Sequence, residues 1–150
     1  MLSASYVITG STPGALFVNK GLAYVSDYGS AVTHVIDIIT PYNPYKIATI
    51  NASRSNTLLW GMVSAFSDRY IYLASGSGAG GAAIDLFDME TPAEPKLISS
   101  VTIYNEAKYT FGGIAVFGNY LFGANYGSSP GTGLPGQGTT GTLDVFSIAH

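Results

Sequence analysis

The fold of this chain is constrained most by a short pattern that occurs twice, 51 residues apart. In each occurrence an apolar run ends in an aspartate, and a threonine and two prolines follow at fixed distances. The first occurrence is Asp37, Thr40, Pro41 and Pro44, and the second is Asp88, Thr91, Pro92 and Pro95. Self-similarity at a period of roughly 20–50 residues is typical of proteins built from copies of one supersecondary unit. We therefore expect the chain to contain several copies of one unit.

The part of the unit that precedes this pattern occurs three times. It consists of an apolar run, a polar turn and a second apolar run, at residues 16–25, 65–73 and 116–122. In the third copy another apolar run follows at residues 143–147, with no segment of two prolines after it. The sequence thus contains two longer units and a shorter third one.

These runs are predicted to be β-strands, four to a unit, which we label A to D. Val, Ile, Tyr and Phe fill the runs, and Gly, Asn, Asp and Pro separate them, as is usual for strands and turns. No stretch has a sustained 3.6-residue apolar period, so no long helix is predicted. The predicted strands are A near 15–18, 62–66 and 113–117, B near 22–26, 70–75 and 120–125, C near 32–38, 82–88 and 142–147, and D near 45–50 and 96–103.

This arrangement resembles the LVIVD-repeat family of β-propellers. The resemblance is carried by Val35-Ile36-Asp37-Ile38 with Thr40-Pro41 and Pro44, by Leu86-Phe87-Asp88 with Thr91-Pro92 and Pro95, and by the Asn119-Tyr120 turn. The third copy departs from the pattern, because Ser147 stands where the other two copies have aspartate. The resemblance implies a propeller fold and a surface or secreted location, and it implies no catalytic residues.

The predicted fold class is all-β and β-propeller-like, a single unit over residues 1–150 with three four-stranded antiparallel blades. The expected parts are a donated strand at 1–10, blade 1 at 13–51, blade 2 at 60–104 and an incomplete blade 3 at 112–148. Residues 4–10 look like a strand D, which the third copy lacks. Three blades cannot close a ring, since propellers typically have about 4–8. The N-terminal strand is therefore expected to complete the last blade of a neighbouring chain.

Three arrangements fit this expectation, and the sequence leaves all three open. Two chains of three blades each can close one ring, or head-to-tail exchange that does not close can build a filament. Alternatively, the sequence is an excerpt of a longer protein. In the first two cases the partner is another copy of the chain, joined by strand exchange into a homo-oligomer or polymer.

Composition excludes some partners and favours a location. Only 10% of the residues are charged, against about 25% in ordinary soluble domains, which favours an extracellular or surface protein over a cytosolic one. The N-terminus lacks the pattern of a signal peptide. Lys and Arg total 6 and the net charge is −3, so nucleic acid is not an expected partner. The absence of Cys excludes disulfides, and no apolar run is long enough for a membrane span.

Two glycine motifs match patterns of active sites, and neither has the context that the chemistry needs. Gly76–Gly81 matches G-x-G-x-x-G, but the residues that follow predict a strand rather than the helix that would hold a phosphate. Gly127–Gly131 matches G-x-S-x-G, but Pro130 favours an extended loop and the only His downstream is His150. Both segments are therefore interpreted as loops, and no catalytic residue or cofactor is predicted.

The remaining candidates are single polar residues on or beside predicted strands. His34 lies in a strand C and is interpreted as structural, and no metal site is predicted around it. Asp37 and Asp88 recur in register, so we expect them to accept N–H bonds in the following turn rather than to catalyse. Asn51 begins an N-glycosylation triplet with Ser53, and it is the one predicted modification site.

The leading functional hypothesis is a non-catalytic structural protein that self-assembles through propeller blades at the cell surface or outside the cell. The alternative is a propeller that binds a carbohydrate or a protein through its B–C loops, of which the Gly-rich segment at 127–141 is the longest. Tyr side chains and Trp60 would supply aromatic surface for such binding. An enzyme on a propeller scaffold is the third hypothesis.

Overall fold

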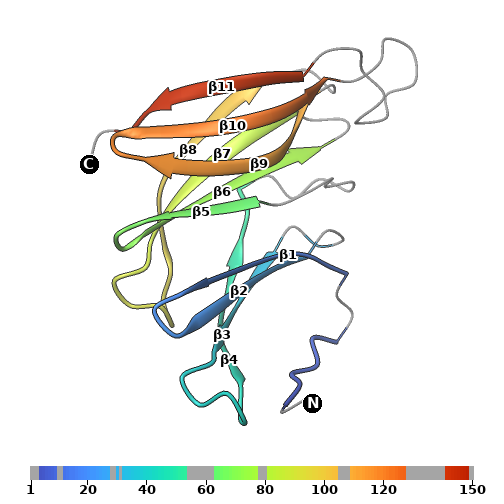
Figure 1. The fold of residues 1–150 in the computed structure, drawn as a ribbon, viewed down its shortest axis with the longest axis vertical. Helices are drawn as coiled ribbons and strands as arrows, with labels where there is room; N and C mark the ends of the chain where they lie inside the picture. The colour runs from blue at the N-terminus through green and yellow to red at the C-terminus, as the bar shows by residue number, and fades with distance from the viewer. Residues whose placement is uncertain are drawn as a thin grey trace.

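In a computed structural model the chain is all-β, as predicted. The structure describes residues 4–9, 12–27, 30, 32–53, 63–77, 81–104, 109–127 and 141–148. All regular secondary structure in these ranges is β-strand. The strands form three small antiparallel sheets that lie one above another (Figure 1). Each sheet is built from strands that follow one another in the sequence, since antiparallel neighbours need no crossover connection.

The first sheet has the order β1-β2-β3-β4 and the second has the order β5-β6-β7-β8. The strands of the first sheet are β1 (Pro13–Asn19), β2 (Leu22–Asp27), β3 (Val32–Asp37) and β4 (Tyr45–Asn51). Those of the second are β5 (Val63–Ser67), β6 (Tyr70–Ser77), β7 (Gly81–Asp88) and β8 (Lys96–Tyr104). The predicted strands A to D of these two units are all present.

The third sheet has three strands in the described part of the chain, in the order β11-β10-β9. They are β9 (Tyr109–Phe117), β10 (Tyr120–Gly127) and β11 (Gly141–Ser147). The strand β9 begins earlier than predicted, because a bulge at Gly112 of β9, between the pairs Ala124↔Gly113 and Asn125↔Phe111, lets its pairing with β10 continue to Tyr109. Of residues 1–10, predicted to be a strand that pairs in another chain, residues 4–9 are described and form no strand in this structure.

The three sheets can be compared position by position. In each sheet, counted in chain order, the last residue of the third strand pairs with the first residue of the second strand. These pairs are Leu22↔Asp37, Tyr70↔Asp88 and Tyr120↔Ser147. In each sheet the next residue donates its backbone N–H to the turn that precedes the paired strand. These bonds are Ile38 to Gly21 (2.9 Å), Met89 to Arg69 (2.9 Å) and Ile148 to Asn119 (2.8 Å).

The recurring aspartates hold the turns that follow them. The Oδ1 of Asp37 accepts the backbone N–H of Ile39 at 2.9 Å, and that of Asp88 accepts the N–H of Glu90 at 2.9 Å. The carbonyls of the recurring threonines accept the next bonds, from Asn43 to Thr40 (2.9 Å) and from Glu94 to Thr91 (2.8 Å). The predicted acceptor role of both aspartates is confirmed.

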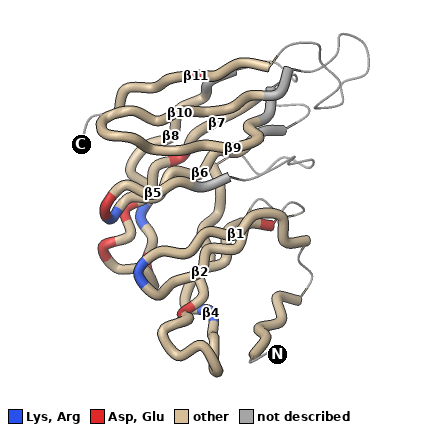
Figure 2. The backbone as a smooth tube through the Cα atoms, in the orientation of Figure 1, with Lys and Arg blue, Asp and Glu red and all other residues tan. Residues whose placement is uncertain are grey.

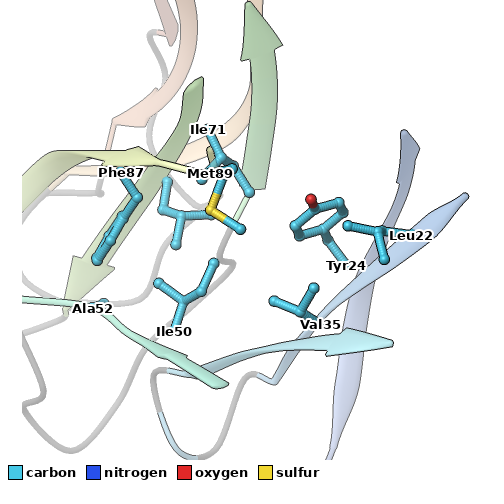
Figure 3. Close-up of a cluster of buried hydrophobic side chains, with 9 residues drawn as sticks. Leu22, Tyr24, Val35, Ile50, Ala52, Ile71, Phe87 and Met89 are labelled. Carbon is cyan, nitrogen blue, oxygen red and sulfur yellow. The ribbon is translucent and has the colours of Figure 1, made fainter. Parts of the chain in front are cut away.

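The sheets pack face to face, with the same two faces meeting at each junction. We call the face of the first sheet that carries Tyr24 and Val35 its front, and we name the faces of the other sheets by the corresponding positions. The front of the first sheet packs on the back of the second, around a cluster of Leu22, Tyr24, Val35, Ile50, Ala52, Ile71, Leu73, Phe87 and Met89 (Figure 3). The ring of Phe66 stacks on Phe17 with centroids 4.8 Å apart and contacts Tyr24 at 4.6 Å.

The second junction repeats this arrangement one sheet further along. The front of the second sheet packs on the back of the third, around a cluster of Ala65, Tyr72, Ala74, Ala82, Ile84, Phe111 and Leu121. The ring of Phe111 lies over Gly123, where a Cβ atom would be 2.8 Å from the ring carbon Cδ1. Two continuous cores thus join three sheets, and the front of the third sheet and the back of the first lie at the two ends of the stack.

Candidate functional site

The candidate site is an apolar groove between the second and third sheets, which we call the β11 groove. It has a volume of about 570 Å³ and runs along β11, at the edge of the three-stranded sheet. Its walls come from the front of the second sheet and from β11 and the residue after it. The lining includes Ile84, Leu86, Ile98, Val101, Phe146 and Ile148.

The groove lies where a fourth strand of the third sheet would be. Ile50 of β4 and Val101 of β8 occupy the same register position, opposite Thr33 and Ile84 respectively. Ile50 is 1% exposed, whereas Val101 is 55% exposed. The second sheet, which faces Ile50, has a fourth strand, and the third sheet, which faces Val101, has none in the described residues. Val101 therefore lacks the cover that Ile50 has.

The strand β11 forms an edge of its sheet, and an edge strand presents a row of backbone N–H and C=O groups to a further strand. In the described part of the chain β11 pairs only with β10, from Tyr120↔Ser147 to Tyr126↔Gly141. An apolar groove beside a free strand edge is the arrangement that accepts an extended peptide: backbone bonds give affinity, and alternate side chains enter the groove.

The front of the third sheet is a second uncovered apolar surface. Its exposed side chains are Phe117, Tyr120, Leu143 and Val145. Leu143 is 69% exposed, whereas Ile84 at the same position of the second sheet is 8% exposed. The strands β9 to β11 carry a single charged residue, Asp144, which lies on the back of the sheet with Phe146. The charged residues instead gather mainly around turns of the first two sheets (Figure 2).

The back of the first sheet lies at the other end of the stack, and on this face the edge strand β1 is exposed whereas Ala23, His34 and Ile36 of the central strands are buried. Val18 on this face is 54% exposed, and Leu16 beside it is also exposed. At the position of Val18 the second sheet has Phe66, which packs against Tyr24 of the sheet before it. In the described part of the chain no preceding sheet lies against Val18.

The back of the first sheet also holds a buried histidine. His34 pairs with Val25 at the position that Asp85 and Asp144 occupy in the other sheets. Neither ring nitrogen of His34 has a hydrogen-bond partner. Burial of the imidazole, aided by Lys46, lowers the pKa of His34 below its ordinary value of 6.5, and Asp27 opposes this shift. The ring is thus held neutral at neutral pH, with unused hydrogen-bonding capacity.

The corresponding position of the second sheet shows how such a group is satisfied at a junction. Asp85 is fully buried, and it accepts the backbone N–H of Ser53 at 2.7 Å and the Ser53 hydroxyl at 2.5 Å. Ser53 follows the last strand of the preceding sheet. This contact was not predicted from the sequence, although the 51-residue register places Asp85 at the position of His34.

The other residues singled out in the sequence are not brought together. Gly76 lies in β6, which ends at Ser77, and Gly81 begins β7. A strand thus follows the first glycine motif as predicted, and residues 78–80 lie outside the described ranges. Gly127 ends β10, and Ser128 to Gly131, His150 and Trp60 are likewise outside them. Asn51 ends β4 with an exposed side chain, and its glycosylation stays a prediction.

Comparison of the chain with protein-family models and with curated proteins finds no match. In the described residues no group of three His, Cys, Asp or Glu side chains could hold a metal ion. Nor do these residues include a helix with the length and apolarity needed to cross a membrane. The candidate functional surfaces are therefore the β11 groove, the front of the third sheet and the back of the first sheet.

Proposed function

We propose that the protein is a non-catalytic structural protein that assembles with copies of itself, each copy donating residues 1–10 as the fourth strand of a neighbour's third sheet. The observation that carries the proposal is the β11 groove, an apolar channel beside a free strand edge. Burying the apolar side chains that line it would gain about 25 cal/mol per Å² of surface removed from water. The open groove is therefore a binding site for a strand.

The N-terminal segment has the properties of the missing strand. It contains the run Tyr6-Val7-Ile8, with β-branched and aromatic side chains, and the side chains of Tyr6 and Val7 are exposed. It forms no strand in this structure and leads directly into β1. In the same way β4 leads to β5 and β8 leads to β9, so a fourth strand precedes each new sheet.

In this proposal the three sheets are consecutive blades of a β-propeller, as the LVIVD-repeat resemblance implies. The face-to-back packing of the sheets and the matching turns around Asp37 and Asp88 support this interpretation. The low content of charged residues supports a place in an assembly at the cell surface or outside the cell.

The test is the oligomeric state of the full chain and of a variant without residues 1–10, measured by sedimentation velocity at micromolar concentration. We expect the full chain to assemble and the deletion variant to be monomeric. A synthetic peptide of residues 1–10 should bind the deletion variant, and a peptide of the same composition in scrambled order should not. A compact, folded monomer of the full chain would contradict the proposal, as would full assembly of the deletion variant.

A further inference from the structure

We infer that copies of the chain meet head to tail: the front of the β9–β11 sheet of one copy packs on the back of the β1–β4 sheet of the next. This inference rests on the proposed function, since it assumes that the partner is a second copy, and it specifies which surfaces meet. The alternative within self-assembly is a two-fold contact, in which a face meets the same face of its partner.

The first argument is that both junctions inside the chain already use this pair of faces. Front meets back between the first and second sheets and again between the second and third. In the described residues the stack leaves one front and one back without a facing sheet, on the sheets at its two ends. A contact between these two surfaces would repeat the internal junction, whereas front on front or back on back has no precedent in the molecule.

The second argument is that the uncovered faces carry the side chains that such a junction needs. Phe122 on the front of the third sheet stands where Tyr24 and Tyr72 stand in the internal junctions, and both tyrosines are buried there. Val145 stands where Val35 is buried. The front of the third sheet carries no charged side chain, so its burial would leave no charge unpaired.

The third argument comes from chain connectivity. Inside the molecule the fourth strand of one sheet leads into the first strand of the next, and the back of that next sheet covers the front of the first. If residues 4–8 complete the third sheet of a neighbour, the same connection places β1 and the back of its sheet over that neighbour's front. Strand donation and face packing thus predict the same polarity independently.

His34 marks where the polar contact of this junction would form. In the first junction the buried acceptor Asp85 is bonded by Ser53, which follows the fourth strand of the neighbouring sheet. His34 occupies the same position on the back of the first sheet, and its two unpartnered ring nitrogens are already buried within the chain. A polar group after the fourth strand of the preceding copy's third sheet would reach them once the side chains that cover the ring move aside. With residues 4–8 as that strand, the group would come from the same copy as His34.

The test uses one blocking substitution on each face, Leu143→Glu on the front and Val18→Glu on the back, with Tyr42→Glu as the matched control. All three side chains are exposed, and Tyr42 lies in the turn between β3 and β4, outside the strands that form the two faces. Circular dichroism and thermal unfolding check that each variant folds. We expect each blocking variant alone to self-associate at least about 100-fold more weakly, because a charge would be buried without a partner. Tyr42→Glu should assemble like the unmodified chain.

The decisive sample is an equimolar mixture of the two blocking variants. The Val18→Glu chain keeps an intact front and the Leu143→Glu chain keeps an intact back, so the mixture should form a one-to-one heterodimer of two 15.6 kDa chains and nothing larger. If Leu143→Glu alone still dimerises through its back, or Val18→Glu through its front, the contact is two-fold and the inference is wrong. If the unmodified chain assembles and neither substitution weakens it, the inference fails while the proposed function stands. A monomeric unmodified chain overturns both.

Discussion

The backbone N–H and the hydroxyl of Ser53 both bind the carboxylate of Asp85, at 2.7 and 2.5 Å, across the junction between the first and second sheets. The Ser53 hydroxyl also lies 2.9 Å from that of Ser100. Because Asp85 is fully buried, this carboxylate has exchanged its water for bonds from the neighbouring sheet. The contact fixes how the two sheets are aligned, since the donors and the acceptor belong to different sheets.

Asp85→Ala is therefore expected to destabilise the fold strongly. The substitution removes two bonds to a charged acceptor and leaves the backbone N–H of Ser53 without the carboxylate, at a cost of about 3 kcal/mol in unfolding free energy. Urea denaturation of the purified protein measures the loss. Asp37→Ala is the control, because Asp37 binds the turn at an exposed site and should cost about 1 kcal/mol. Equal losses in the two variants would contradict the proposed role of Asp85.

The packing of the Phe111 ring on the third sheet requires that residue 123 has no side chain. A Cβ atom there would overlap the ring of Phe111, which is buried in the second junction. Gly123→Ala is expected to lower the unfolding free energy by about 1–3 kcal/mol, since an overpacked core must shift its neighbours. Gly113→Ala, in the adjacent strand, is the matched control because its Cβ would meet nothing within 4 Å.

A second substitution tests whether the Phe111 ring is the cause. In the double variant Gly123→Ala with Phe111→Leu, the smaller side chain should relieve the overlap. The loss should then be smaller than the sum of the two single losses, because contacting residues are not additive. A purely additive result would show that the cost of Gly123→Ala arises elsewhere.

The pH dependence of stability follows from His34. Burial lowers its pKa in the folded state below the value of 6.5 that it has in the unfolded chain. As the pH falls below about 6.5, the unfolded state takes up the proton first, so the unfolding free energy should fall until the pH passes the lowered folded pKa. Above about 6.5 this contribution should be constant.

Urea denaturation between pH 5 and pH 8 measures this dependence. His34→Gln should flatten the curve in this window, because the titrating group is gone. Acidic side chains titrate mainly below this range, at about pH 4 in unperturbed form. A curve that stays steep in His34→Gln would assign the dependence to another group.

Much of the fold could be predicted from the sequence because its determinants are local. Alternating apolar residues and turn residues such as Pro41 and Pro92 mark where strands begin and end, and the aspartate before each turn accepts a bond only two residues away. The start of β9 lies earlier than the predicted strand because its pairing with β10 continues past a bulge at Gly112 in β9 itself. A glycine such as Gly112 both weakens a strand and often marks a bulge, so the residues alone do not show that the strand continues.

The candidate site was harder to predict because burial depends on what lies opposite. Ile50 and Val101 are both β-branched residues in a strand D. The residues around them do not show that one is covered and the other exposed. The difference arises from the strand composition of the facing sheet, which is a tertiary property. Asp85 likewise looks like any strand carboxylate until Ser53 is placed beside it.

The β11 groove gives a prediction about peptide binding, in which a residue that lines the groove is compared with one that does not. The assay uses isothermal titration calorimetry to measure how the peptide of residues 1–10 binds to the chain that lacks these residues. Val101→Asp places a charge on the groove wall and should weaken binding at least tenfold, because the charge must be desolvated without a partner when the strand enters. The comparison variant is Leu97→Asp, a similarly exposed position on the same strand that pairs with Phe87 and does not line the groove. It should bind the peptide like the parent chain. If both variants bind equally well, the peptide docks somewhere other than the groove, and equal weakening in both would indicate damage to β8 rather than loss of a binding surface.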